Sequence, residues 1–333
     1  MIETETLPSS LLQRPRRNRK SAAIRSLVQE TQLTPRDLVA PFFLIEGREK
    51  RQSISALPGI DRLSIDLILK EAEGLHAAGV PAIALFPVID PSFKDPIGSY
   101  ALNPEGVVPQ AVQYLKEKIP SLCVITDIAL DPFTSHGHDG ILGDCDEVLN
   151  DETVEVLAQM AILHAQAGAD IVAPSDMMDG RIQAIRRALD AHGHQNTSIL
   201  SYAAKYASSL YAPFRHALGS GLKSGDKKGY QMNPANVREA LREASLDEME
   251  GADMLMVKPA LYYLDVISKI KENTHLPVCA YHVSGEYAMV MAAHERGMLN
   301  APQVFLEALL SIKRAGADFI FTYAASQIIP LIS

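Results

Sequence analysis

The segment Ala315-Gly316-Ala317-Asp318-Phe319-Ile320-Phe321-Thr322-Tyr323 contains the pattern that decides the fold. A glycine suited to the end of a helix is followed by an apolar run of the length of a buried strand. The same order of residues occurs at Ala167–Pro174 and at Gly251–Lys258. Helices that end directly before apolar strands are typical of alternating β and α units. The sequence therefore predicts an α/β protein with parallel strands.

The pattern repeats along most of the chain and predicts eight apolar strands. They are residues 39–44, 82–86, 122–127, 171–174, 198–205, 254–258, 277–281 and 319–323. Eight βα repeats over roughly 250 to 300 residues are the signature of a TIM (β/α)8 barrel. An open doubly wound sheet is the alternative, but no Gly-x-Gly-x-x-Gly follows an early strand. We therefore expect a catalytic TIM barrel over residues 36–333.

The first 35 residues differ from the rest of the chain. Arg14-Pro15-Arg16-Arg17-Asn18-Arg19-Lys20 is a basic cluster without apolar periodicity. Such a segment cannot bury a face of its own, so residues 1–35 are expected to form an extended N-terminal arm. A short helix is expected at residues 21–30. The start of the chain lacks the basic and apolar pattern of a signal peptide.

The composition excludes several classes of protein. It is ordinary for a soluble globular protein, with 47 % hydrophobic and 21 % charged residues. No apolar run approaches the roughly 20 residues of a membrane span. The net charge of −9 argues against general affinity for nucleic acid or anionic membranes. Cys123, Cys145 and Cys279 lie far apart, which predicts a reducing, cytoplasmic compartment and no disulfide framework.

Two of the predicted strands end in lysine. Lys205 closes the strand at 198–205, and Lys258 closes the strand at 254–258. Burying an ammonium without a partner is costly, and the same cost lowers its pKa toward neutrality. The amine is then nucleophilic, as a Schiff-base lysine must be. A salt-bridged or surface lysine is the alternative interpretation of either residue alone.

Other polar residues are predicted at the same rim, because functional side chains of a barrel gather where its strands end. The strand ends carry Asp127, Ser175, Asp176, Lys205, Lys258, Ser284 and Tyr323. The loop at residues 127–140 adds more carboxylates and two imidazoles. Carboxylates here are suited to bind a cationic amine, hold a metal or move protons. The alternative is an ordinary loop of turn-forming residues.

The segment 211–231 is long, basic and rich in glycine and serine. This composition suits a mobile lid, in which Arg215 and Lys227 are placed to clamp a substrate carboxylate. A solvated basic loop is the alternative. A Schiff-base lysine, a carboxylate clamp and nearby acids together predict a small keto acid with an amino group. Two lysines suggest either two substrate molecules or one nucleophile whose pKa the other cation lowers.

At these residues the chain resembles the porphobilinogen synthases, also called 5-aminolaevulinate dehydratases. The resemblance covers nearly the whole chain, and its distinctive motifs are residues 14–17, 103–106, 131–137, 173–181, 202–207, 257–259 and 283–287. It implies a lyase that condenses two 5-aminolaevulinate molecules asymmetrically to porphobilinogen with loss of two waters. This reaction belongs to tetrapyrrole and haem biosynthesis.

The resemblance also implies a role for each matching residue. Lys258 corresponds to the Schiff-base lysine of the propionate-side site, and Lys205 corresponds to the lysine of the acetate-side site. Asp127, Asp131 and Asp139 are implied to orient substrate amines and help proton transfer. The implied substrate contacts are Arg215 and Lys227 for one carboxylate, Ser284 and Tyr323 for the other, and Ser175, Tyr281 and Gln231.

The chain departs from the zinc-dependent members of that family. Those members carry three cysteines at the positions of Ala129, Asp131 and Asp139, so a Cys₃ zinc site is excluded here. The chain resembles the aspartate-rich branch, in which hard cations such as Mg²⁺ and monovalent cations are expected. Glu243 corresponds to a carboxylate that binds an activating, allosteric Mg²⁺ away from the active site; a plain helix-surface glutamate is the alternative.

Two further points stay open at the level of the sequence. His136 and His138 leave room for an unconventional zinc site. The arm corresponds to one that wraps a neighbouring subunit, usually in a homo-octamer, whereas a nucleic-acid module built on residues 14–20 is disfavoured by the acidic net charge. The rival enzyme is a class I aldolase acting on a keto-sugar, which needs a phosphate site that no glycine-rich cradle supplies.

Overall fold

The computed structural model describes residues 12–144 and 146–332. Cys145 and the first eleven residues of the predicted arm lie outside this range. The chain divides into two compact units between Gln32 and Leu33. In the part of the chain that the structure describes, no helix has both the length and the apolar character to cross a membrane.

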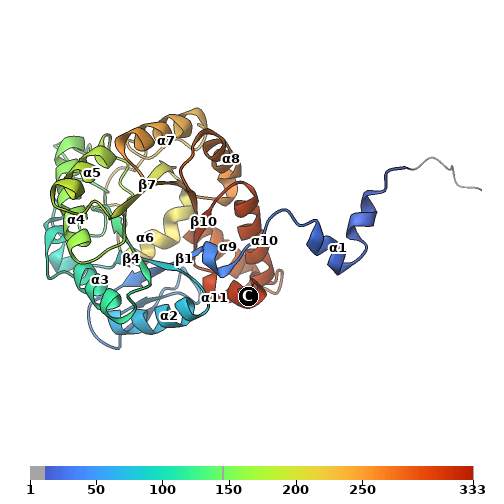
Figure 1. The fold of residues 1–333 in the computed structure, drawn as a ribbon. Helices are drawn as coiled ribbons and strands as arrows, with labels where there is room; N and C mark the ends of the chain where they lie inside the picture. The colour runs from blue at the N-terminus through green and yellow to red at the C-terminus, as the bar shows by residue number, and fades with distance from the viewer. Residues whose placement is uncertain (1–11, 145, 333) are drawn as a thin grey trace, which may run out of the picture. The chain divides into compact units, whose positions relative to one another are not determined.

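The larger unit is a closed barrel of eight parallel strands (Figure 1). Each strand pairs with the next one along the chain, and β10 pairs with β1 to close the ring. The predicted TIM barrel is thus confirmed, and every predicted strand is present to within one residue at each end. The strands are β1 Leu38–Leu44, β4 Ala82–Pro87, β5 Cys123–Ile128, β6 Ile171–Pro174, β7 Ser198–Lys205, β8 Met254–Lys258, β9 Val278–His282 and β10 Phe319–Thr322.

Helices surround the barrel, and their ends follow the glycine pattern in the sequence. Gly79, Gly168, Gly251 and Gly316 all have positive φ and follow α2, α4, α7 and α10, because glycine adopts the left-handed conformation at little cost. The helices are α2 Ile65–Ala77, α3 Val107–Lys118, α4 Asn150–Gln166, α5 Arg181–Ala191, α7 Arg238–Glu250, α8 Leu264–Asn273, α9 Ser284–Glu295, α10 Ala301–Arg314 and α11 Ala325–Ile332.

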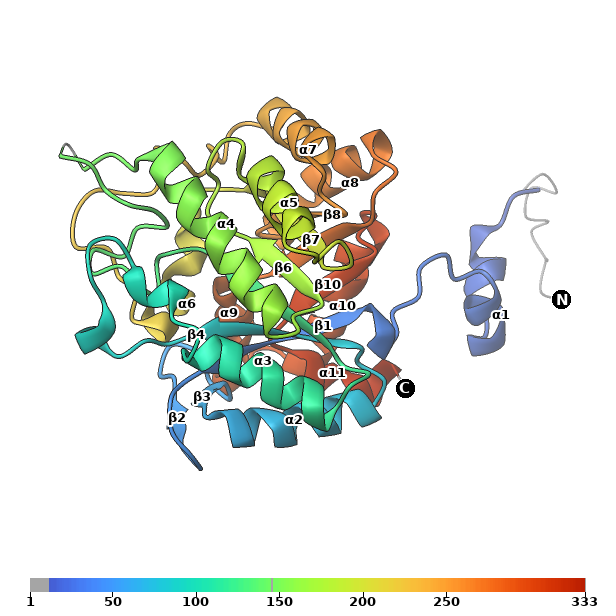
Figure 2. The ribbon, with the colours of Figure 1, turned by 60° about the vertical axis from the view of Figure 1, so that its left-hand side comes forward.

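A short hairpin was not predicted from the sequence. It consists of β2 Arg51–Ser53 and β3 Asp61–Leu63, and it is visible at the lower left of Figure 2. Phe43 pairs with Arg62, so the hairpin extends the sheet beside the carboxyl end of β1. Three-residue strands are too short to show a reliable period of two. The hairpin matters because it places Arg62 at the rim where the predicted functional residues lie.

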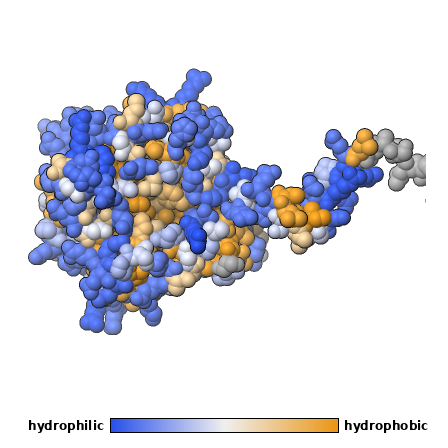
Figure 3. All heavy atoms as spheres, viewed as in Figure 1, coloured by the Kyte–Doolittle hydropathy of each residue, from blue (hydrophilic) through white to orange (hydrophobic). Residues whose placement is uncertain are grey.

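The smaller unit contains η1 Pro15–Arg19 and α1 Ala22–Leu27. The Oγ of Ser21 accepts a hydrogen bond from the N–H of Ile24 at 3.3 Å, so α1 begins where predicted, but it ends earlier than expected. No residue of either helix is buried. Figure 3 shows apolar atoms gathered on this unit, and the side chains of Leu12, Leu27 and Val28 are among the exposed large apolar ones.

Candidate active site

The two predicted lysines meet at the carboxyl ends of adjacent strands. Lys205 of β7 and Lys258 of β8 are paired in the sheet register, and both are almost fully buried. A small cavity of about 20 Å³ lies beside them. It is lined by Phe86, Asp127, Asp131, Asp139, Ser175, Lys205, Tyr211, Phe214, Arg215, Lys227, Gln231 and Lys258. The fold thus brings most of the predicted site residues to one place.

Lys258 lies among aromatic rings. Its Nζ is 4.5 Å from the ring centre of Tyr281, 4.9 Å from that of Phe214, 5.0 Å from that of Tyr202 and 5.3 Å from that of Tyr211. Among the described residues, no carboxylate forms an ion pair with it. Burial first, and then the charge of Lys205, lower the pKa of Lys258 to about 7. A buried amine with this pKa is a nucleophile near neutral pH.

Lys205 has polar surroundings instead. Its Nζ donates to Asp139 Oδ2 at 3.2 Å and to the carbonyl oxygen of Ser175. Asp139 also accepts from Lys227 Nζ at 2.6 Å. Burial raises the pKa of Asp139, but the two lysines outweigh it and hold that pKa well below its usual range. Asp139 is therefore a carboxylate that compensates the charge of two buried lysines.

Asp127 is the carboxyl group most suited to exchange a proton. It is the last residue but one of β5 and interacts electrostatically with Lys258, and burial together with the nearby Asp131 raises its pKa to about 7. Its Oδ1 is buried and accepts no hydrogen bond from any described residue. Asp131 lies 3.8 Å from Lys227 Nζ. A carboxyl group that titrates near neutral pH is able to give and take protons at low cost.

Three of the predicted substrate residues do not line the cavity. Ser284 Oγ accepts from the N–H of Phe214 at 3.1 Å and donates to the carbonyl oxygen of Leu210 at 3.2 Å. The hydroxyl groups of Tyr281 and Tyr323 are hydrogen-bonded at 3.1 Å. In this closed arrangement Ser284 thus supports the cavity residue Phe214, and Tyr323 supports Tyr281, whose ring contacts the amine of Lys258.

The predicted lid covers the cavity. It contains α6 Ala212–Leu218 and the loop that leads to Gln231. His138 holds this loop, because its Nδ1 lies 3.1 Å from the hydroxyl of Tyr230 and its Nε2 lies 3.1 Å from the carbonyl oxygen of Ser224. His136 bonds through Nε2 to the carbonyl oxygen of Pro96 at 3.0 Å and accepts through Nδ1 from the His138 N–H. All four ring nitrogens of the two histidines are thereby engaged.

The predicted metal residue lies elsewhere. Glu243 of α7 lines a separate pocket of about 590 Å³. Burial first, and then Asp247, raise the pKa of Glu243. The other acidic residues of this pocket are Asp146, Glu147, Asp179, Asp226 and Glu239. No group of three or more His, Cys, Asp or Glu residues within residues 12–144 and 146–332 is arranged to hold a metal ion.

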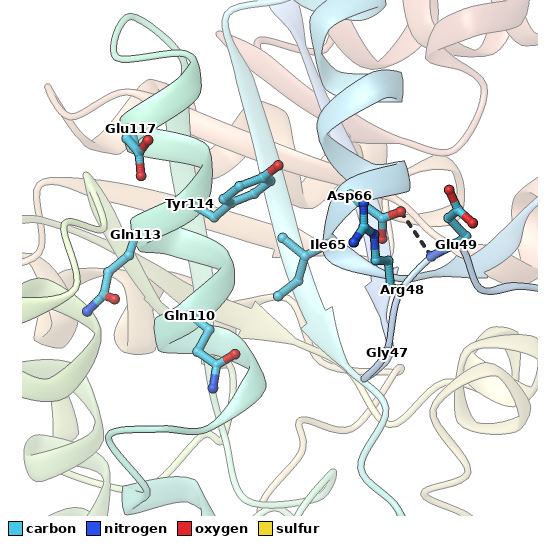
Figure 4. A pocket seen from close by; sticks show the side chains of 9 residues that line it. All are labelled: Gly47, Arg48, Glu49, Ile65, Asp66, Gln110, Gln113, Tyr114 and Glu117. Carbon is cyan, nitrogen blue, oxygen red and sulfur yellow. Dashed lines mark hydrogen bonds between the residues drawn. The ribbon is translucent and has the colours of Figure 1, made fainter.

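A further surface pocket of about 540 Å³ contains none of the residues discussed above. Figure 4 shows it between the loop at Gly47–Glu49, the start of α2 and one face of α3. The backbone N–H of Glu49 donates to Asp66 Oδ2 at 2.9 Å on one side of this pocket. Its side chains point outward from separate elements and do not converge on one point.

Apart from Tyr281, the aromatic residues around Lys258 and the cavity are the part of the site that the sequence did not reveal. Phe86 comes from β4, Tyr211 from η5 Ser209–Tyr211, and Phe214 from α6. Tyr202 lies three residues before Lys205, and regular alternation places such residues on opposite faces of a strand. The register of β7 shifts between Ser201 and Ala204, so alternation does not predict where Tyr202 lies.

The fold and the site together define a TIM-barrel enzyme with amine chemistry at its carboxyl rim. The family model for delta-aminolevulinic acid dehydratase matches residues 12–331. The chain belongs to this family, which confirms the predicted activity, the lyase reaction that forms porphobilinogen.

Relatives and a solved structure agree with this assignment. The chain is 57 % identical over 323 residues to a delta-aminolevulinic acid dehydratase of Chlamydia pneumoniae, with 97 % of each chain covered. It is 53 % identical to one of Bradyrhizobium diazoefficiens, with 94 % of this chain and 89 % of the relative covered. The crystal structure of the Toxoplasma gondii ME49 enzyme in complex with porphobilinogen is similar with a TM-score of 0.94 at 50 % identity. That match covers 96 % of this chain and 91 % of the other.

Proposed function

We propose that this chain condenses two 5-aminolaevulinate molecules to porphobilinogen and that Lys258 is the principal Schiff-base residue. The observation that carries the proposal is the aromatic surround of Lys258, whose nearest ring centre is 4.5 Å away. This surround favours the neutral amine. Its nitrogen attacks the ketone carbon of the propionate-side substrate, and the carbonyl oxygen leaves as water when the imine forms.

Lys205 is proposed to bind the second substrate molecule through its ketone. Lys205 is ion-paired with Asp139, and a substrate must displace this carboxylate before the lysine can react. When the ammonium group of the incoming substrate takes the place of Lys205 beside Asp139, Lys205 passes a proton to Asp127, and its neutral amine forms the second Schiff base. Because the two adjacent lysines have different surroundings, they react with the two identical substrate molecules one after the other.

The remaining residues are proposed to orient the substrates. Arg215 and Lys227 lie on the lid beside the cavity and are placed to bind the carboxylate of the second substrate. Ser284 and Tyr323 bind the carboxylate of the first once the aromatic residues between them and Lys258 move. Asp127 exchanges protons with the reacting groups, Asp131 and Asp139 hold the amines, and Ser175, Tyr281 and Gln231 complete the substrate contacts.

Glu243 is proposed to bind an activating Mg²⁺. The residues fit this ion, because the pocket is rich in carboxylates and Mg²⁺ keeps several waters while binding one or two protein carboxylates. Glu243 would hold the ion, and the ion would stabilise the loops of this pocket, which include Tyr230 and Gln231 of the lid. Monovalent cations are proposed to bind to the same acidic surface.

The arm is proposed to contact a neighbouring subunit in a homo-octamer. Support comes from its exposed apolar side chains, Leu12, Leu27 and Val28, since exposed apolar groups of this kind are typical of contact surfaces. A cytoplasmic location is proposed from the scarcity of cysteines, and Cys123 and Cys279 are free thiols.

Borohydride trapping with 5-aminolaevulinate, followed by peptide mass spectrometry, tests the main proposal. The expected result is a reduced adduct on Lys258, with or without one on Lys205. Absence of an adduct on both lysines in folded protein supplied with Mg²⁺ would refute the Schiff-base assignment. Formation of porphobilinogen from 5-aminolaevulinate alone separates this function from that of a class I aldolase.

A further inference from the structure

The cavity beside Lys258 is too small for a substrate while the lid is closed. Its volume of about 20 Å³ has room for on the order of one water and not for a substrate molecule. Substrate entry and product release therefore require α6 and the following loop to move. The contacts that hold the end of α6 then decide how much of the time the lid is closed.

The last backbone carbonyl groups of α6 outnumber the N–H groups that the chain itself supplies to them. Gly219 adopts the left-handed conformation with φ 62° and ends the helix. The N–H of Ser220 bonds to the carbonyl oxygen of Arg215 at 3.1 Å, and the N–H of Gly219 bonds to that of His216. This Schellman arrangement satisfies those two carbonyls and supplies no donor to Ala217 or Gly219.

Two cations from outside the lid supply the missing donors to Ala217 and Gly219. Arg62 Nε donates to the carbonyl oxygen of Ala217 at 2.6 Å, and Arg62 Nη2 adds a second donor to the carbonyl oxygen of His216 at 2.9 Å. Lys94 Nζ donates to the carbonyl oxygen of Gly219 at 3.1 Å. Arg62 lies on β3, which is paired with the end of β1, so it is anchored to the barrel itself. Lys94 directly follows η3 Pro91–Phe93.

We propose that Arg62, assisted by Lys94, is a positioning residue that latches the lid over the active site. The latch fixes the end of α6 and thereby the positions of Phe214 and Arg215. Phe214 contacts Lys258, and both side chains line the cavity. Arg62 and Lys94 do not line the cavity themselves and act through backbone carbonyls alone. The inference rests on the proposed role of the lid in substrate binding.

Lid closure itself is measurable without the reaction. The chain contains no tryptophan, so Leu222→Trp, in the lid loop, gives a single fluorophore. Introducing Arg62→Met into this background keeps an unbranched side chain as far as the position of Nε and removes both donors. The expected result is a red-shifted, more quenchable tryptophan and faster tryptic cleavage at Lys223 and Lys228, because charge-assisted bonds to the lid are lost.

Kinetics then connect the latch to function. Arg62→Met is expected to raise KM about ten-fold while kcat changes less than about two-fold, because a less populated closed state lowers apparent affinity. Arg62→Lys, which restores one donor, should recover part of the affinity. Arg51→Gln is the matched control: Arg51 lies on the same hairpin but pairs with Asp61 and Glu71 rather than with the lid.

The outcomes separate this inference from the proposed function. Unchanged fluorescence, cleavage and KM in Arg62→Met, in protein whose Lys258 is still trapped by borohydride, would overturn the latch alone. Equal effects of Arg51→Gln and Arg62→Met would also overturn it, because they would show that Arg62 only stabilises the hairpin. Loss of trapping in the unmodified chain would instead refute the site assignment.

Discussion

Lys205 and Lys258 are the same type of residue at paired positions on neighbouring strands, yet their surroundings are opposite. Lys205 donates to a carboxylate and a backbone carbonyl. Lys258 faces four aromatic rings. The charge-compensated site of Lys205 and the apolar site of Lys258 thus lie on adjacent strands. The difference teaches that the reactivity of a lysine is set by the residues around it, and that one barrel rim is able to hold both kinds.

The largest effect is expected when the apolar site loses its amine. Lys258→Met keeps an unbranched side chain that suits an aromatic surround, so the fold should persist. We expect kcat to fall on the order of 10⁴-fold or more, because no other amine occupies that position. Porphobilinogen formation measured beside an unchanged thermal melt checks this. Activity within ten-fold of the unmodified chain would show that Lys258 is not the nucleophile.

A substitution in the polar site around Lys205 should lower the unfolding free energy of the protein and not only its reaction rate. Asp139→Asn leaves the charges of Lys205 and Lys227 without their shared carboxylate. Breaking a buried ion pair from one side costs about 3–5 kcal/mol of unfolding free energy. Denaturant unfolding measures the loss. Asp226→Asn is the control, since Asp226 is an exposed partner of Lys228, and its removal should leave the unfolding midpoint nearly unchanged.

The pH dependence tests whether the two sites influence each other. The pKa of Lys258 is about 7, and the amine is neutral above it. The fraction of Lys258 trapped by a short borohydride pulse should therefore rise with pH through about 7. Lys205→Met removes the positive charge that is the second cause of this low pKa, so the rise should move about one pH unit upward. A rise at unchanged pH would show that the two lysines do not interact electrostatically.

The same low pKa has a consequence for stability. The pKa of Lys258 lies below its ordinary value of 10.5, so the unfolded chain binds the extra proton between about pH 7 and 10.5. This group therefore makes the folded state more stable as pH rises through that window. Asp127, whose pKa is also about 7, titrates together with Lys258, so the profile belongs to the pair.

Much of the barrel and of the polar site could be predicted from the sequence. The carboxyl ends of the parallel strands all lie at one rim of a barrel. The lengths and apolar patterns of the predicted strands therefore suffice to place Lys205, Lys258 and Asp127 at this rim. The lid was visible in its composition, and Arg215 and Lys227 indeed line the cavity. These inferences depend on local patterns, which a single sequence contains.

The other aromatic residues around Lys258 and the latch could not be predicted, for physical reasons. The position of Tyr202 depends on a register shift inside β7, and no residue type marks such a shift. Arg62 reaches α6 across more than 150 residues of chain, through carbonyl oxygens that every residue has. Backbone acceptors and close packing between distant segments leave no signature in a linear pattern.

The smallest expected effect distinguishes two contributions to the apolar site. Phe214 excludes water from Lys258, which lowers its pKa, but its ring also stabilises the ammonium by a cation–π contact, which raises it. Because burial is the largest cause of the low pKa, Phe214→Leu should move the trapping profile about 0.5 pH unit upward. Phe93→Leu, which changes an exposed ring stacked on Tyr100, should leave it in place. A downward movement in Phe214→Leu would mean that the ring acts mainly as a cation binder, and Lys258 would then have to be regarded as a bound ammonium.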